Sequence, residues 1–482
     1  MPARSRTRSR ALVTVITILV ALALATTSVE AQEPDSAPPT APGTTAPPQH
    51  LTTSLLSARR VPNLLRTPIA DAQLAASVAD IVGEAPPASC ISIRAGGRTA
   101  FEHNPTLPLE PASANKILTS YAILQKADPQ ERLATTAVAS APAEGGVIRG
   151  DLWIVGGGDA MLNTPGYTAS FEYPEQPVND PAALADRIKA AGITEITGNI
   201  VGDDSRYDAQ RSVATWPDRY RREDTVGSLG ALMINHGVTG YADSPERASS
   251  TRMPGDPPLL AAETLETMLE ARGVEVGGGP AAGTAPAGST EIARLESVPI
   301  GEIVTETLSW SDNTTAELLT KELGLRTSGT GSTPAGTQAT RDALVAAGFP
   351  TDGLVINDGS GLDTENRLTC DLLADVLDAE GPDSVIGQGM AISGQRGTLR
   401  KRLRGTEAEG KVIAKTGTLT TPPVSSLAGF VTTRSGEVVT FSFIQNGPLT
   451  DASLSDQLAL ALYEYPQAPT LADLGPKPPT AA

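Results

Sequence analysis

Histidine is scarce in this chain of 482 residues, which has only His50, His103 and His236. A Ser-His-Asp hydrolase would have to use His103 or His236, and neither belongs to a local hydrolase signature. The nucleophile-elbow pattern G-x-S-x-G is absent, as are the HExxH and CxxC patterns of metal sites. A catalytic base in this chain is therefore expected to be a residue other than histidine, and no metal site is predicted.

Cysteine is also rare, with Cys90 and Cys370 as the two examples. Two cysteines allow one intramolecular disulfide, and an exported protein can keep such a bond because its environment is oxidising. The alternative is a pair of small buried thiols, since free cysteine packs as an apolar side chain. The sequence leaves both possibilities open.

Basic residues are fewer than acidic ones: the chain has 37 Lys and Arg and 55 Asp and Glu, which gives a formal net charge of -18. Nucleic acids and anionic membrane surfaces attract proteins through clustered positive charge. The sequence therefore predicts no nucleic-acid partner and no attraction to an anionic membrane. The simplest interpretation of the acidic excess is an ordinary solvated surface.

Long apolar runs are limited to the N-terminus. Four arginines between residues 4 and 10 precede the largely apolar run 11–25, and small residues follow at 29–31. This pattern predicts a secretory signal peptide at residues 1–31. An uncleaved signal anchor is the alternative, but a spanning helix needs ~20 apolar residues. We expect an exported protein of the cell envelope or the exterior, with no stable membrane span after signal cleavage.

Composition divides the rest of the chain. Residues 32–50 are rich in Pro, Thr and Ala and are predicted to form an extended linker, and residues 466–482 are predicted to form a flexible tail. Residues 144–295 have short strand patterns and many Gly and Pro, which indicates an inserted domain. Residues 51–143 and 296–465 would then form one discontinuous catalytic domain.

The predicted elements mix helices with strands. Apolar residues at helical spacing predict helices at 74–82, 117–124, 182–191, 303–308, 314–323 and 454–463. Alternating or continuous apolar runs predict strands at 89–93, 99–101, 151–155, 198–201, 411–415, 426–432 and 437–445. The Gly- and Ala-rich stretch 277–289 is expected to be a loop. Together these elements predict an α+β fold.

Ser113 and Lys116 form an S-x-x-K pattern at the start of a predicted helix. Residues one turn apart share a helix face, so the Lys116 amine can reach the Ser113 hydroxyl. The helix N-terminus favours developing negative charge, and burial can lower the pKa of a lysine until it serves as a base. Taken alone, the pattern is more often a helix cap followed by a solvated lysine.

Two later segments carry comparable chemistry. Ser311-Asp312-Asn313 lies between two predicted helices, and its alternative role is to cap the helix that starts at Thr314. Lys415-Thr416-Gly417-Thr418 ends a predicted strand, where a lysine and hydroxyls suit a ligand carboxylate and Gly417 allows close approach to the backbone. The alternative is an exposed edge strand with a protective lysine.

In this order, S-x-x-K, S-D-N and K-T-G resemble the signature of penicillin-binding proteins and serine β-lactamases. The gaps between them are 311 − 113 = 198 and 415 − 311 = 104 positions. The long first gap leaves room for an inserted domain, and residues 74–465 resemble the class C low-molecular-mass penicillin-binding proteins, the D-Ala-D-Ala carboxypeptidase/endopeptidase family. Further segments that carry the resemblance are 155–159, 198–205, 357–362 and 397–399.

The resemblance implies a penicillin-binding, serine β-lactamase-like transpeptidase domain with an inserted domain between the first and second motifs. It also implies a reaction, the cleavage of peptidoglycan stem peptides between two D-alanines. Ser113 would be the nucleophile, Lys116 would take its proton, and Ser311 would relay the proton to the leaving amine. β-Lactams would acylate Ser113 and leave slowly.

The resemblance further implies the residues that bind the substrate. Asn313 would hold the amide side of the peptide, and Thr416 and Thr418 would hold the terminal carboxylate. Lys415 would keep the local potential positive, and Gly417 would let the substrate approach the strand. No metal or organic cofactor is needed for this chemistry.

Two competing functions share this fold. A serine β-lactamase would use the same chemistry with fast deacylation, and a cell-wall-binding protein would keep the fold without catalysis. The long insert disfavours the first, and a lysine within reach of Ser113 disfavours the second. The sequence does not distinguish carboxypeptidase from endopeptidase activity.

Overall fold

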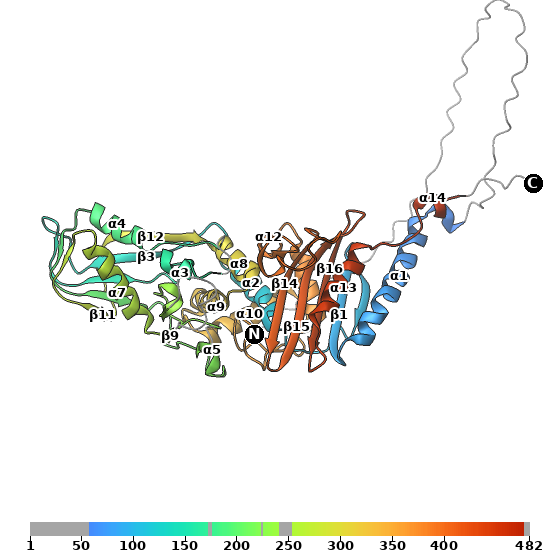
Figure 1. The fold of residues 1–482 in the computed structure, drawn as a ribbon, viewed down its shortest axis with the longest axis horizontal. Helices are drawn as coiled ribbons and strands as arrows, with labels where there is room; N and C mark the ends of the chain where they lie inside the picture. The colour runs from blue at the N-terminus through green and yellow to red at the C-terminus, as the bar shows by residue number, and fades with distance from the viewer. Residues whose placement is uncertain (1–56, 172–175, 223–224, 241–252, 477–482) are drawn as a thin grey trace, which may run out of the picture. The chain divides into compact units, whose positions relative to one another are not determined.

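The computed structural model describes residues 57–171, 176–222, 225–240 and 253–476 (Figure 1). The predicted signal peptide, the predicted linker and the last six residues of the predicted tail lie outside these ranges. Within the described ranges, no helix has the length and apolar character that crossing a bilayer requires. The mixture of helices and antiparallel strands confirms the predicted α+β class.

A six-stranded antiparallel sheet organises the part of the chain that carries the motifs. Its order is β13-β14-β15-β16-β1-β2, so the first strands of the chain pair with the last ones. Cys90 pairs with Ile444 in this register. The strands are β1 (Ala88–Ala95), β2 (Arg98–His103), β13 (Ala391–Ile392), β14 (Val412–Thr420), β15 (Pro423–Thr432) and β16 (Val438–Asn446).

Helices cover both faces of this sheet (Figure 1). On one face of the sheet, an apolar core is formed by α1 (Asn63–Glu84), α13 (Ala452–Tyr463) and strand side chains such as Phe441 and Phe443. The second core lies on the opposite face and includes Ile444, because successive strand residues point to opposite sides. Its helices are α2 (Lys116–Leu124), α8 (Ile300–Ser309), α9 (Asn313–Ser328), α10 (Thr333–Ala347), α11 (Cys370–Glu380) and α12 (Val385–Gly389).

The segment interpreted as an insert contributes most of a second sheet with its own apolar core. The sheet runs β11-β7-β5-β3-β12, and α4 (Ala182–Ala190) and α7 (Pro257–Glu270) pack on it. Its strands are β3 (Arg132–Ala139), β5 (Leu152–Val155), β7 (Ile200–Asp203), β11 (Pro280–Ala282) and β12 (Thr290–Pro299). The sheet therefore begins before residue 144 and ends after residue 295, while the domain boundaries themselves stay predictions.

Most of the predicted helices and strands are confirmed. The predicted helix 74–82 lies within α1, and the predicted strand 437–445 matches β16. The expectation of a loop throughout 277–289 is wrong, because Pro280 to Ala282 form β11. This strand pairs in parallel with β7 through backbone hydrogen bonds while its side chains stay largely exposed, so no apolar alternation marks it. Helices α7, α10 and α11 were not predicted.

The structure decides the open question about the cysteines. Cys90 of β1 and Cys370 at the start of α11 form a disulfide across 280 residues of sequence. Both side chains are fully buried in the core between the sheet and its helices. The bond therefore ties β1 of the sheet to the helical layer that carries the first two motifs.

Removing this disulfide should lower the free energy of unfolding by about 2–4 kcal/mol, because an unfolded chain without the link has more conformational freedom. The change is the double variant Cys90→Ala, Cys370→Ala, measured by urea denaturation. Reduced wild-type protein is the matched control and should lose a similar amount. An unchanged midpoint in the variant would contradict a stabilising bond.

Candidate active site

Ser113 lies in a short 3-10 turn, η2 (Ala112–Asn115), that leads directly into α2. Lys116 is the first residue of α2 and is completely buried. Its Nζ donates to Ser113 Oγ at 2.9 Å. The alternative of a solvated lysine is therefore wrong, and the S-x-x-K spacing gives the contact between amine and hydroxyl that it predicted.

The second motif forms the connection between α8 and α9, as predicted. Ser311 has a left-handed backbone, with φ of 65°, which turns the chain between the two helices. Asp312 caps α9, because its Oδ1 accepts the Thr315 N–H at 2.6 Å. The capping interpretation is thus correct for this aspartate, while its neighbours Ser311 and Asn313 line the cleft. Asn313 Oδ1 accepts from Lys116 Nζ at 2.7 Å.

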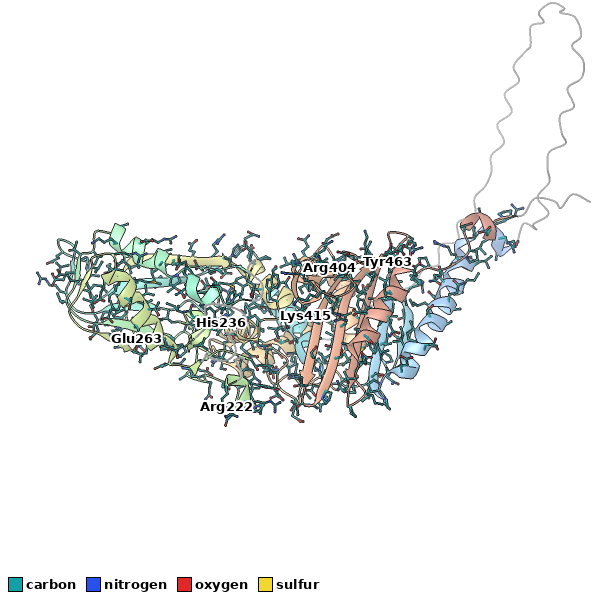
Figure 2. The ribbon with its side chains drawn as sticks, viewed as in Figure 1. Arg222, His236, Glu263, Arg404, Lys415 and Tyr463 are labelled. Atoms are coloured by element: carbon teal, nitrogen blue, oxygen red, sulfur yellow. A yellow bond between two sulfur atoms is a disulfide. The ribbon has the colours of Figure 1, made fainter. Side chains whose placement is uncertain are left out.

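The third motif lies on β14, beside the turn that holds Ser113. Lys415 (labelled in Figure 2) is fully buried, so it is not a protective lysine on an exposed edge. Its Nζ donates to Ser311 Oγ at 2.8 Å and to the Thr416 carbonyl oxygen at 2.6 Å. A Cβ on Gly417 would lie 2.2 Å from Ser426 Oγ and 2.9 Å from Ser113 N, so the strand can approach Ser113 only with glycine here.

Burial shifts the pKa values of both amines downwards. Desolvation lowers the pKa of Lys116 to about 8, although the negative charges of Asp358, Asp312 and Glu317 act in the opposite direction. Burial also holds the pKa of Lys415 well below its usual range, and the positive charge of Lys116 adds to this effect. A neutral amine beside Ser113 is therefore accessible near neutral pH, which is the condition for a lysine base.

A cleft of about 620 Å³ lies above these contacts. Its wall brings Ser113, Ser311 and Asn313 together with Thr416 and Thr418 of β14. Lys116 and Lys415 lie behind the wall, hydrogen-bonded to the two serines. The structure thus assembles the eight residues that the sequence singled out at one place. Their catalytic roles stay predictions.

Part of the cleft wall comes from the segment interpreted as an insert, a contribution that the sequence did not predict. Arg219, Tyr220 and Thr225 all line the cleft. The Thr225 carbonyl oxygen accepts from Asn313 Nδ2 at 2.7 Å, and Arg219 Nη2 donates to the Thr421 carbonyl oxygen at 3.1 Å. These contacts join positions far apart in the chain, and neither a motif nor a periodicity marks them.

Two more residues without a predicted role, Thr398 and Arg402, line the cleft. Thr398 Oγ1 hydrogen-bonds Thr416 Oγ1 at 2.8 Å, and Arg402 lines the cleft while Asp456 lies 2.8 Å from its guanidinium. Thr398 belongs to the segment 397–399. The resemblance of this segment to the family could have identified Thr398 as a site residue. Nowhere in the described ranges do three or more His, Cys, Asp or Glu side chains gather as metal ligands would.

Comparison with known proteins places this arrangement in a family. Residues 71–251 and 236–464 match the model of the D-Ala-D-Ala carboxypeptidase 3 (S13) family. The chain is 29% identical over 447 residues to a D-alanyl-D-alanine carboxypeptidase of Actinomadura sp., covering 77% of this chain and 80% of the relative. It is 30% identical over 378 residues to carboxypeptidase DacB of Mycolicibacterium smegmatis, covering 76% and 78%.

A solved structure supports the same assignment at the level of the fold. Penicillin binding protein 4 (dacB) from Haemophilus influenzae superposes with a TM-score of 0.66 at 20% identity, covering 80% of this chain and 99% of that protein. The fold class inferred from the motifs, a penicillin-binding domain of mixed helix and sheet, is thereby confirmed. By family match, relatives and fold together, this chain is a serine-type peptidase that belongs to the D-Ala-D-Ala carboxypeptidase 3 (S13) family.

Proposed function

We propose that this enzyme cleaves the bond between the two terminal D-alanines of peptidoglycan stem peptides, through an acyl-enzyme on Ser113. The carrying observation is the buried Lys116 amine, 2.9 Å from the Ser113 hydroxyl at the base of the cleft. In its neutral form Lys116 takes the Ser113 proton as Oγ attacks the carbonyl carbon. Ser311 passes a proton to the leaving amine, the C–N bond breaks, and water then hydrolyses the ester.

The remaining motif residues bind the substrate in this proposal. Asn313 holds the peptide amide, and the hydroxyls of Thr416 and Thr418 hold the terminal carboxylate. The backbone N–H groups of Ser113 and Thr418 form the oxyanion hole, where each donor contributes about 3 kcal/mol to transition-state stabilisation. The close approach of Gly417 to Ser113 N supports this pairing of donors.

The charge of Lys415 follows the substrate. In the free enzyme, burial and Lys116 lower the pKa of Lys415, which disfavours its charged form. A carboxylate bound at Thr416 and Thr418 would favour the ammonium form, since an opposite charge within a few ångström raises the pKa of a lysine. Lys415 therefore becomes the positive partner of the substrate carboxylate when the substrate binds.

β-Lactams should act as covalent inhibitors, because they present a reactive carbonyl and a carboxylate to the same groups. A solved structure of the Haemophilus influenzae protein is complexed with a β-lactam, and its fold matches with a TM-score of 0.59. Export, as the N-terminal 31 residues predict, would place the enzyme outside the cytoplasmic membrane, where peptidoglycan lies. The catalytic and inserted domains proposed from the sequence would then act together on one cleft.

Benzylpenicillin should give a stable adduct, one drug molecule per chain, on wild-type protein but not on Ser113→Ala. The reason is that only the wild type has the nucleophile beside Lys116. Intact-protein mass spectrometry of residues 32–482 measures the adduct directly, and peptide mapping locates it. Drug consumed without an adduct would indicate a β-lactamase, and intact drug without an adduct would indicate a non-catalytic protein or a wrong nucleophile.

The rate constant of acylation should rise with pH and level off above the pKa of Lys116, about 8. Below that pKa the amine is protonated and cannot take the Ser113 proton, so the rate should rise by about tenfold between pH 6 and pH 7. Stopped-flow measurement with a chromogenic cephalosporin gives this profile. A Lys116→Ala variant is the control and should lose the acylation. A rate independent of pH from 6 to 8 would exclude Lys116 as the titrating base.

A further inference from the structure

The Lys116 amine has a third acceptor besides Ser113 and Asn313. The carbonyl oxygen of Ser360 accepts from Nζ at 2.7 Å. This oxygen belongs to the backbone, so its position depends on the conformation of the turn Asp358–Gly361. An ammonium group has three donors, and these three acceptors together determine where Nζ lies relative to Ser113 Oγ.

A buried carboxyl group of α9 holds this turn in place. Glu317 Oε1 accepts the backbone N–H of Gly359 at 3.0 Å and that of Ser360 at 2.8 Å. Glu317 is completely buried and follows Asn313 by one helical turn, so both side chains leave the same face of α9. A Cβ on Gly359 would lie 1.8 Å from Thr320 Oγ1, which shows how closely the turn packs on this helix.

Asp358 anchors the other end of the turn through different partners. Its carboxylate accepts from Trp216 Nε1 at 2.8 Å, from Asn366 Nδ2 at 2.9 Å and from the backbone N–H of Gly361 at 2.8 Å. None of these contacts involves the N–H of Gly359 or of Ser360, which donate to Glu317. The Ser360 carbonyl shares a peptide plane with the Gly361 N–H, which Asp358 holds, while Glu317 holds the two preceding N–H groups. The position of the Ser360 carbonyl therefore depends on Glu317 together with Asp358.

We propose that Glu317 is a positioning residue for acylation: by accepting the N–H groups of Gly359 and Ser360, it keeps the Ser360 carbonyl oxygen on the Lys116 amine and the amine aligned on Ser113. This inference rests on the proposed function of Lys116 as the base. Glu317 touches neither the substrate cleft nor the nucleophile, and it acts through the turn and the lysine.

Glu317 also belongs to the electrostatic surroundings of Lys116. Burial raises the pKa of its carboxyl well above the usual range, and the charge of Asp358 acts in the same direction. Either protonation state of the carboxyl can accept the two N–H groups, and in its ionised form its negative charge raises the pKa of Lys116. The other charged groups that face Lys116 are Asp312 at the start of α9, Asp358 in the turn and Lys415 on β14.

The test compares Glu317→Ala with Glu317→Gln. Alanine removes the acceptor, so the turn and Lys116 should drift and acylation by benzylpenicillin should slow by about 10- to 100-fold. Glutamine keeps an oxygen acceptor at the same place and should restore a rate close to wild type. In the alanine variant the acid limb of the profile should also move to lower pH, because the ammonium loses an acceptor.

Glu322→Ala is the matched control for a lost buried carboxyl on the same helix. Glu322 pairs with Arg206 and Arg326 instead of the turn, so this variant should lower the melting temperature but leave acylation unchanged. Wild-type acylation rate and pH profile in Glu317→Ala would overturn the proposal. So would a Glu317→Gln variant as slow as the alanine variant, since the acceptor would then not be what matters.

A crystal structure of Glu317→Ala separates this proposal from the proposed function. We expect the Ser360 oxygen to lie farther from Lys116 Nζ than the present 2.7 Å. An unchanged distance would overturn the positioning role whatever the kinetics. Wild-type protein that forms no adduct would instead overturn the proposed function, while the crystal structure would still decide whether Glu317 positions the lysine.

Discussion

Two lysine amines are removed from water at the centre of this enzyme, and the rest of the structure is arranged around that constraint. A buried ammonium is costly unless its donors are satisfied, so each amine needs acceptors from the surrounding elements. Lys116 has acceptors on η2, α9 and the turn at Ser360, and Lys415 has them in the α8–α9 connection and on β14. The same burial lowers the pKa of both lysines, so the packing that removes the amines from water also makes their neutral forms accessible.

The segment interpreted as an insert contacts this arrangement directly. Thr225 holds the Asn313 side chain, and Gly227 N donates to Thr314 Oγ1 at 2.9 Å. Trp216 hydrogen-bonds Asp358, which anchors the turn beside Lys116. These three contacts connect the segment interpreted as an insert to the second motif, to the first turn of α9 and to the turn beside Lys116. A change in how the insert packs would alter the position of Asn313 and the electrostatics around Lys116.

Helices and strands with clear periodicity could be predicted because their apolar faces are local features of the sequence. The strand 437–445 and the helix 454–463 are examples, and each contributes side chains to one core on the sheet. Strand β11 could not be predicted, since it is held by backbone pairing with β7. Arg219 and Tyr220 were missed for a related reason: their position at the cleft results from tertiary packing.

The sequence by itself determined the reactive groups: a serine and a lysine one helical turn apart, and two later motifs with hydroxyl, amide and amine groups in a recognisable order. It also determined the family, because that order and spacing are specific. Only the tertiary structure decided that Lys116 and Lys415 are buried, that Cys90 and Cys370 are bonded, and that Glu317 supports the turn at Ser360. The physical reason is that hydrogen-bond geometry and pKa depend on neighbours brought from distant parts of the chain, which no local pattern records.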